Sequence, residues 1–287
     1  MGTGQMLAAA VSSLIAAIQV AAAQADDAAA TPYLVVSTQQ SDNGKGGTSF
    51  DRDTILVTPT VSDEAGSTFI YDLPPTATEA ERASSWKFPA TIRFAPDGSR
   101  ILVNEAEFKA RIDLWLTHGG YTRDACGRWI FTWNAFKIEC DPLTVLGAVE
   151  HFDLGPADLT NGRSLMVEGA ARSGRLKLIA SSATGKSYTV SYPLDPDHIR
   201  RKRAESDVIV GQILGKPFTS DAALAAQRRD RISGDISEQF DTDSTGRIIR
   251  RTTVTTVVTI APDGMQLTAK TDRTLERRAV ESSDSGK

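Results

Sequence analysis

The sequence predicts an α+β fold that is mainly antiparallel β. We expect one curved or barrel-like sheet, one amphipathic helix packed on it at about residues 104–118, and one or two further short helices. Segments that alternate apolar and polar residues follow one another at hairpin spacing after residue 155. The turn sequence Ala-Pro-Asp-Gly occurs at 95–98 and again at 261–264, each time between two such segments. Strands with one apolar side at this spacing indicate an antiparallel sheet that is solvated on its other side.

Residues 1–25 are predicted to be a cleavable signal peptide. They carry no charged side chain, contain an apolar run at 7–18, and end in Ala-Gln-Ala at 23–25. No Lys or Arg precedes the run, so the α-amino group is the positive charge there. A membrane anchor is the alternative, but two serines interrupt a run that is shorter than the roughly 20 apolar residues of a span. We therefore expect a periplasmic or secreted protein whose mature chain starts at Asp26.

The next segment, 26–85, is interpreted as an N-terminal arm that adds peripheral strands and ends in a linker. Residues 76–83 are polar and follow two prolines, which is typical of a linker or a short helix. The main antiparallel-sheet domain is expected over 86–276 as one cooperative unit, and the polar tail 277–287 is expected to be disordered. Short strands rich in β-branched and aromatic residues are predicted in the arm at 33–37, 54–58 and 68–71.

Three helices are predicted from their start signals. Asn104 is placed to cap the first helix, with Glu107 at the capping-box position. A second helix opens at Asp195, which precedes a proline in the first turn, and a third over 221–229 is capped by Ser220. The first helix has one apolar stripe that should pack on the sheet, formed by Phe108, Ile112, Trp115 and Leu116.

Strands account for most of the remaining chain after residue 155. In the segment 247–260, Val254, Val258 and Ile260 alternate with polar or small residues, so their side is predicted to be the apolar one. The expected strands are 165–171, 175–180, 187–192, 232–240, 247–260 and 265–275.

Cys126 and Cys140 are the two cysteines of the chain, and in an exported protein they are predicted to form a disulfide. A zinc or redox pair would need closer spacing or further ligands. A continuous strand over these 14 steps would separate the Cα atoms by about 46 Å, which is far beyond the reach of a disulfide. The chain must therefore turn back or coil between the cysteines, as a hairpin or as a helix.

Aromatic residues are concentrated between the two cysteines. The favoured interpretation is that they form the main core, because large aromatics dominate cores. The alternative is a wall around an apolar ligand or a glycan. The candidate ligand-lining residues are Trp115, Trp129, Trp133 and Phe136.

Nucleotides and nucleic acids are not expected as partners. The segment 180–187 fits a relaxed P-loop pattern, but the residues after it are β-branched and aromatic, so the helix that must cradle the phosphates is missing. We interpret 183–186 as a hairpin turn. The basic runs 200–203 and 228–231 lack the interleaved aromatics of single-strand readers and are interpreted as solvated helix faces. The formal net charge of −4 agrees with this.

The favoured function is an exported, non-catalytic binding protein for an apolar ligand or an envelope partner, such as a lipid. Export, a one-sided sheet and clustered aromatics support it, since a concave antiparallel sheet holding a helix is a shape that periplasmic lipid carriers use. No cofactor and no metal are expected. The alternative is an envelope-directed hydrolase with a site around His151 and His198, for which no nucleophile motif such as Gly-x-Ser-x-Gly is present.

Overall fold

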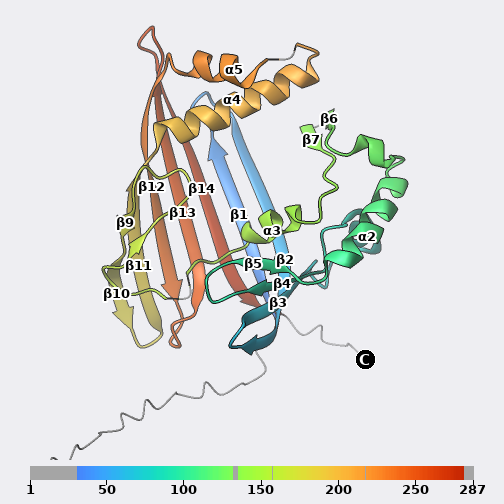
Figure 1. Cartoon of the computed structure of the whole chain (residues 1–287). Coiled ribbons are helices and arrows are strands. Elements are labelled where there is room, and N and C mark those ends of the chain that lie inside the picture. The colour runs from blue at the N-terminus through green and yellow to red at the C-terminus, as the bar shows by residue number, and fades with distance from the viewer. Residues whose placement is uncertain (1–30, 132–134, 157, 217, 281–287) are drawn as a thin grey trace, which may run out of the picture.

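The computed structural model describes residues 31–131, 135–156, 158–216 and 218–280 (Figure 1). The predicted signal peptide and residues 281–287 of the predicted tail lie outside the described residues. Within the part of the chain that the structure describes, no helix combines the length and the apolar character that crossing a bilayer requires.

A ten-stranded antiparallel sheet forms the body of the molecule. Its strand order is β10-β11-β12-β13-β14-β1-β2-β3-β4-β5, so each strand pairs with its neighbour in sequence, except that β14 pairs with β1. Two small two-stranded sheets, β6-β7 and β8-β9, lie outside it. The strands are β1 Tyr33–Asp42, β2 Thr48–Asp63, β3 Gly66–Asp72, β4 Ala90–Phe94, β5 Arg100–Leu102, β6 Trp129–Phe131, β7 Ala135–Lys137, β8 Ser164–Leu165, β9 Gly174–Arg175, β10 Lys177–Ser182, β11 Gly185–Pro193, β12 Arg231–Thr242, β13 Ile248–Ile260 and β14 Gln266–Ala279.

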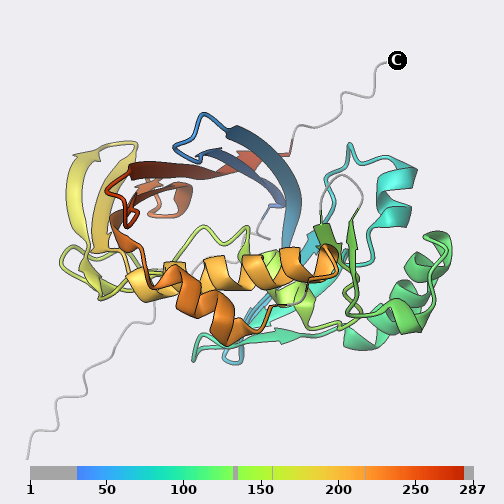
Figure 2. The same cartoon turned by 90° about the horizontal axis from the view of Figure 1, so that it is seen from above.

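The sheet is strongly curved, as predicted, but it does not close into a barrel, because β10 and β5 remain as two free edges. Figure 2 shows it from above as a trough whose open side is crossed by α4 and α5. We refer to the side of the sheet under these helices as the covered face. The helices are α1 Glu79–Ser84, α2 Glu105–His118, α3 Thr144–Glu150, α4 Pro196–Ile213 and α5 Ser220–Gln227, with a 3-10 turn at Arg123–Ala125.

The strands of the N-terminal arm are not peripheral, which corrects the prediction. β1 lies between β14 and β2 in the interior of the sheet, and its ten residues pair with both neighbours. β14 continues to Ala279, which lies opposite Tyr33 of β1. The expected disordered tail therefore begins within a strand, which corrects that prediction for residues 277–279. Local sequence shows that a segment is extended, but one of the two partners of β1, the strand β14, is more than 200 residues away along the chain. That the whole sheet unfolds as one cooperative unit stays a prediction.

The side of β13 that the rest of the chain covers is the opposite of the one predicted to be apolar. Arg251 contacts the segment after α3, and Thr259 contacts α4, so the odd-numbered residues from Arg251 to Thr259 lie on the covered face. Before the register shift at the start of β13, Ile248 lies on that face and packs on the core. Val254 and Val258 point the other way and are half-buried among polar neighbours on β12 and β14. Periodicity shows that two sides of a strand differ, but it does not show which side the rest of the chain covers.

Several turns form as predicted. In both Ala-Pro-Asp-Gly turns the glycine has a positive φ, 84° at Gly98 and 85° at Gly264, which this turn requires. The P-loop-like segment is a hairpin turn between β10 and β11, with Ser182 opposite Gly185. A side chain at Gly185 would collide with the backbone oxygen of Thr242, which accounts for the glycine without a phosphate. The predicted strand 165–171 is wrong for most of its length, since β8 ends at Leu165.

The three predicted helices are present, with two corrections at their caps. The Asn104 side chain makes no cap hydrogen bond to α2; its oxygen accepts from the N–H of Thr91 in β4 at 2.9 Å and ties the helix start to the sheet. α5 begins at Ser220 itself, because Thr219 is the cap and accepts from the N–H of Ala222 at 3.2 Å. The linker region contains α1, a short helix with a complete capping box.

The covered face has an apolar core at each end and a polar strip between them. At one end, Phe108, Ile112 and Leu116 of α2 pack with residues of β1 to β4, as the stripe predicted. At the other end, residues of β11 and β12 pack with the segment 159–176. The strip between the cores lies on β13, β14 and β1 and includes Arg251 and Arg273. Apolar side chains therefore do not fill the middle of the trough.

The predicted disulfide between Cys126 and Cys140 is present, with Cα atoms 5.6 Å apart. Between the cysteines the chain turns back as a hairpin, since β6 and β7 pair antiparallel with Trp129 opposite Lys137. The helical alternative is therefore wrong.

We expect protein purified from the periplasm or culture medium to contain no free thiol and to start at Asp26. Intact mass before and after reduction with alkylation measures both. Replacing both cysteines with alanine should lower the free energy of unfolding by about 3 kcal/mol, because the bond restricts the unfolded chain. Two alkylated cysteines in unreduced material would contradict the disulfide, and a mature mass that includes residues 1–25 would contradict cleavage.

Candidate functional site

The hairpin of α4 and α5 carries the first candidate site, and its shape is encoded locally. Asp195 caps α4 by accepting from a backbone N–H of the first turn at 2.9 Å. At the other end Gly215 has φ 65°, and the N–H of Lys216 donates to the oxygen of Gly211 at 2.8 Å, which closes α4 with a Schellman motif. Thr219 then caps α5. The two helices consequently fold back on each other and form a groove between them.

The groove between α4, α5 and β6 is a mainly apolar cavity of about 470 Å³. We call it the α4–α5 groove. Trp129 enters it from β6, so the disulfide-closed hairpin supplies one wall. Its apolar lining residues are Trp129, Ala204, Val208, Ile209 and Leu224, and its polar ones are Arg201, Glu205, Gln212 and Ser220.

Two arginines of α4 hold the helix across the sheet. Arg203 donates to the hydroxyl of Thr259 on β13 at 2.8 Å, and Arg200 donates to the backbone oxygen of Asp230 at 3.1 Å. Their side chains are 34% and 20% exposed, whereas Arg201 is 55% exposed. The interpretation of 200–203 as a solvated face is therefore wrong for two of its four residues, because a run of charges on a helix faces both the sheet and the solvent.

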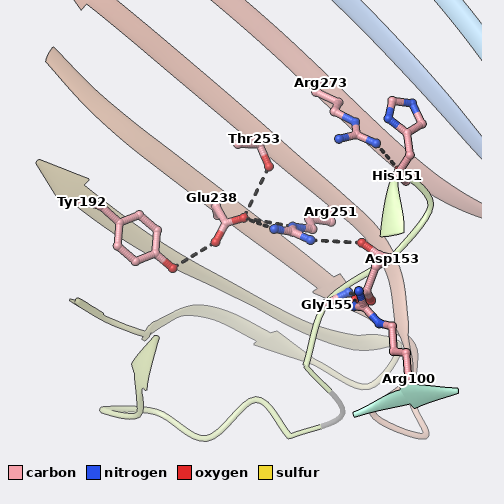
Figure 3. Close-up of polar contacts among 9 residues, drawn as sticks. All are labelled: Arg100, His151, Asp153, Gly155, Tyr192, Glu238, Arg251, Thr253 and Arg273. Carbon is pink, nitrogen blue, oxygen red and sulfur yellow. Dashed lines mark hydrogen bonds and ion pairs between the residues drawn. The ribbon is translucent and has the colours of Figure 1, made fainter. Parts of the chain in front are cut away.

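A charged network on the covered face joins the polar strip to the neighbouring strands β12 and β11 (Figure 3). Glu238 on β12 is 3% exposed and accepts from the hydroxyl of Tyr192 at 2.9 Å and from Nε of Arg251 at 2.9 Å. Burial and then the carboxylate of Glu238 raise the pKa of Tyr192 above its ordinary value, so the hydroxyl remains a donor. Arg251 also donates to the backbone oxygen of Asp153 at 3.0 Å. The network therefore joins β11, β12 and β13 to the segment after α3.

A second cavity of about 480 Å³ lies between this network and the chain above it. We call it the trough cavity. The segment above it is fixed by Arg100 of β5, which contacts Asp153 at 2.6 Å and Glu150 at 3.2 Å. Its lining residues are Glu150, Asp153, Gly155, Pro156, Met166, Val167, Glu168, Arg251, Thr253, Arg273 and Leu275.

His151 lies beside Arg273 at the edge of the strip (Figure 3). Its Nε2 is 3.3 Å from the hydroxyl of Ser37 and 3.9 Å from a carboxylate oxygen of Asp53. In a catalytic triad the serine and the acid contact different ring nitrogens, so that the acid orients the base. Here both contact the same nitrogen, and Ser37 is only 2% exposed. Burial and then Arg273 lower the pKa of His151 below its ordinary value. This arrangement is not a triad.

The structure does not bring the two candidate histidines to a common partner. Nε2 of His198 lies 3.7 Å from Glu168, whereas His151 contacts Ser37 and Asp53. Over the described residues, no group of three or more histidine, cysteine, aspartate and glutamate side chains is placed to hold a metal ion.

The predicted ligand-lining aromatics are separated. Trp129 lines the α4–α5 groove. Trp115 is half-buried against the core under α2, and Phe136 is 38% exposed on β7. Trp133 lies outside the described residues. The main core is formed by other residues, among them Phe108, so the interpretation that the Cys126–Cys140 aromatics dominate it is not supported by Trp129 or Phe136.

Sequence reasoning missed the charged network and the trough cavity. A signal was present, because Glu238 lies between Ile236 and Phe240 on the same side of a predicted strand. A carboxylate on an otherwise apolar side requires a buried partner. The sequence could not identify Arg251 as that partner, since the register of β12 with β13 decides it.

No protein-family model matches this chain, and a search of curated proteins finds no match. Among solved structures, the crystal structure of a LolA superfamily protein from Nitrosomonas europaea is similar over 88% of each chain, with 9% sequence identity and a TM-score of 0.18. A TM-score this low says nothing about the fold, ligand or activity of this chain.

Proposed function

We propose that this chain is an exported, non-catalytic binding protein that holds an apolar ligand, such as a lipid chain, in the α4–α5 groove. The groove itself carries the proposal. Its volume of about 470 Å³ lies within the range of roughly 300–1,000 Å³ that small-molecule sites occupy. Apolar side chains from three elements line it, with a few polar groups among them, which is the composition expected of such a site.

Two further observations support this function. The disulfide is typical of an oxidising compartment, which agrees with an exported protein. Trp129 offers a flat aromatic surface to the ligand, and the hairpin that carries it is tied at its base by the disulfide. Preorganised walls lower the entropy that binding would otherwise cost.

The geometry at His151 does not favour the hydrolase alternative. A serine nucleophile must be reached by its substrate, yet Ser37 is buried and contacts the same nitrogen as Asp53. The proposed function is binding without catalysis, so ligand affinity is the property to measure.

We expect Val208→Asp to weaken binding of an apolar fluorescent probe, such as a dansylated undecanol, at least tenfold, because a carboxylate in an apolar groove must be desolvated. Val208 lines the groove, whereas Val210 is 49% exposed on the same helix and does not line it. Val210→Asp is thus a matched control that should bind normally. Fluorescence titration measures the affinity, and circular dichroism confirms that both variants are folded. Equal affinities for the two variants would refute the groove as the site.

A further inference from the structure

Among the described residues, Arg251 and Arg273 are the cations that line the trough cavity, and Arg273 has no carboxylate at ion-pair distance, whereas Arg251 contacts Glu238. Nη2 of its guanidinium donates to the backbone oxygen of His151, and its buried Nε has no acceptor among the described residues. Elsewhere among the described residues, two other arginines also have a buried nitrogen without an acceptor, but each has a carboxylate at ion-pair distance. These are Arg111 with Glu107 at 3.6 Å and Arg200 with Asp197 at 2.7 Å.

The acidic residues around the cavity are already paired with other cations. Glu150 and Asp153 share the single guanidinium of Arg100, and Glu238 contacts Arg251. A fourth, Glu168, lies 3.6 Å from Lys202 and 3.7 Å from His198. The carboxylate of Asp53 opposes the lowering of the pKa of Arg273, but no ion pair joins the two side chains in the described structure. Arg273 is therefore left without an ion-pair partner among the described residues.

Burial makes the charge of Arg273 costly. Burial and then the like charge of Arg251 lower the pKa of Arg273, although an arginine stays protonated in proteins. A guanidinium that is partly desolvated and has a free N–H is suited to a carboxylate or phosphate, which it binds through charge-assisted hydrogen bonds. An anion at this place would offset the repulsion between Arg251 and Arg273.

The cavity also has apolar walls next to Arg273. Leu275, two residues further along β14, is 3% exposed and lies on the same face. Val167, Met166 and Pro156 line the cavity from the chain above the sheet, and Met166 is 62% exposed. An apolar wall beside an unmatched cation fits a ligand that has both a charged end and a hydrocarbon part.

We propose that the trough cavity binds the anionic head group, a carboxylate or a phosphate, of an amphiphile, with Arg273 as its charged partner. The apolar part lies against Leu275 and Val167. This site shares no lining residue with the α4–α5 groove, so it goes beyond the proposed function. A failure of one site can be told from a failure of the other, because Val208→Asp affects only the groove and Arg273→Met only the trough cavity.

The test is calorimetric titration of the full oxidised chain with laurate, dodecyl phosphate, dodecanol and inorganic phosphate. Each ligand is titrated into the wild type, Arg273→Met and Arg278→Met. Arg278 is the matched control, because it lies on the same strand, is 50% exposed, and points away from the covered face. We expect the wild type and Arg278→Met to bind at least one anionic amphiphile tenfold or more tightly than dodecanol. In Arg273→Met this preference should disappear.

Each other outcome would overturn the proposal. Equal affinity of the wild type for the anionic amphiphiles and dodecanol would show that no cation selects the ligand. An unchanged preference in Arg273→Met would exclude Arg273. Inorganic phosphate that binds as tightly as dodecyl phosphate would exclude an amphiphile. If Arg273→Met does not fold, Arg273→Lys should keep the preference, and the wild-type preference should weaken in high salt.

Discussion

Phe108→Ala is expected to lower the free energy of unfolding by about 3–5 kcal/mol, as large-to-small changes of buried aromatics do. Phe108 is 0% exposed and lies at the centre of the stripe that joins α2 to the sheet. Its ring packs edge-to-face on Trp86 at a centroid distance of 6.2 Å, and the guanidinium of Arg111 lies 4.0 Å from its centroid. The substitution removes both contacts and leaves a cavity between α2 and the sheet.

Urea denaturation followed by circular dichroism measures this loss. Phe136→Ala is the matched control, since Phe136 is 38% exposed, and its loss should stay below about 1 kcal/mol. Similar losses for the two variants would mean that α2 does not form the main core with the sheet. That result would instead support the interpretation that the aromatics between the cysteines dominate the core.

Glu238→Leu is expected to cost about 3–5 kcal/mol, because it removes one partner of a buried ion pair and leaves the other charged. Glu238 is 3% exposed, and its loss leaves Arg251 without a carboxylate and the hydroxyl of Tyr192 without an acceptor. Adding Arg251→Met should restore most of the stability, since a pair of apolar residues can replace a buried pair of charges. Urea midpoints of the single and double variants measure both effects.

The matched control for Glu238→Leu is Glu276→Leu. Glu276 pairs with Arg250 and Arg278 on the other face of the same sheet, where solvent screens the charges. We expect a loss below about 1 kcal/mol for this variant. If the double variant is no more stable than Glu238→Leu, the loss in Glu238→Leu does not come from leaving the charge of Arg251 unpaired.

Much of the local structure could be predicted because short-range chemistry decides it. In the Ala-Pro-Asp-Gly turns the glycines adopt the positive φ that the absence of a Cβ allows. The spacing from Phe108 to Leu116 places an apolar stripe on α2. The pair Cys126 and Cys140 required the chain between them to reverse, which the β6–β7 hairpin does. Of the candidate site residues, the half-buried Trp129 lines a cavity.

The sequence by itself determined the antiparallel β class, the helices α2, α4 and α5, the turns and the disulfide, because each depends on residues close together in the chain. The helix α3 was not predicted. Tertiary structure alone decided the pairing of β1 with β14, the side of β13 that is covered, and the meeting of Glu238 with Arg251. The physical reason is that alternation in a strand is symmetric between its two faces, whereas burial depends on elements from distant parts of the chain. The α4–α5 groove is likewise formed by helices and a hairpin from distant parts of the chain, and the trough cavity by β13, β14 and the segments that cross above them.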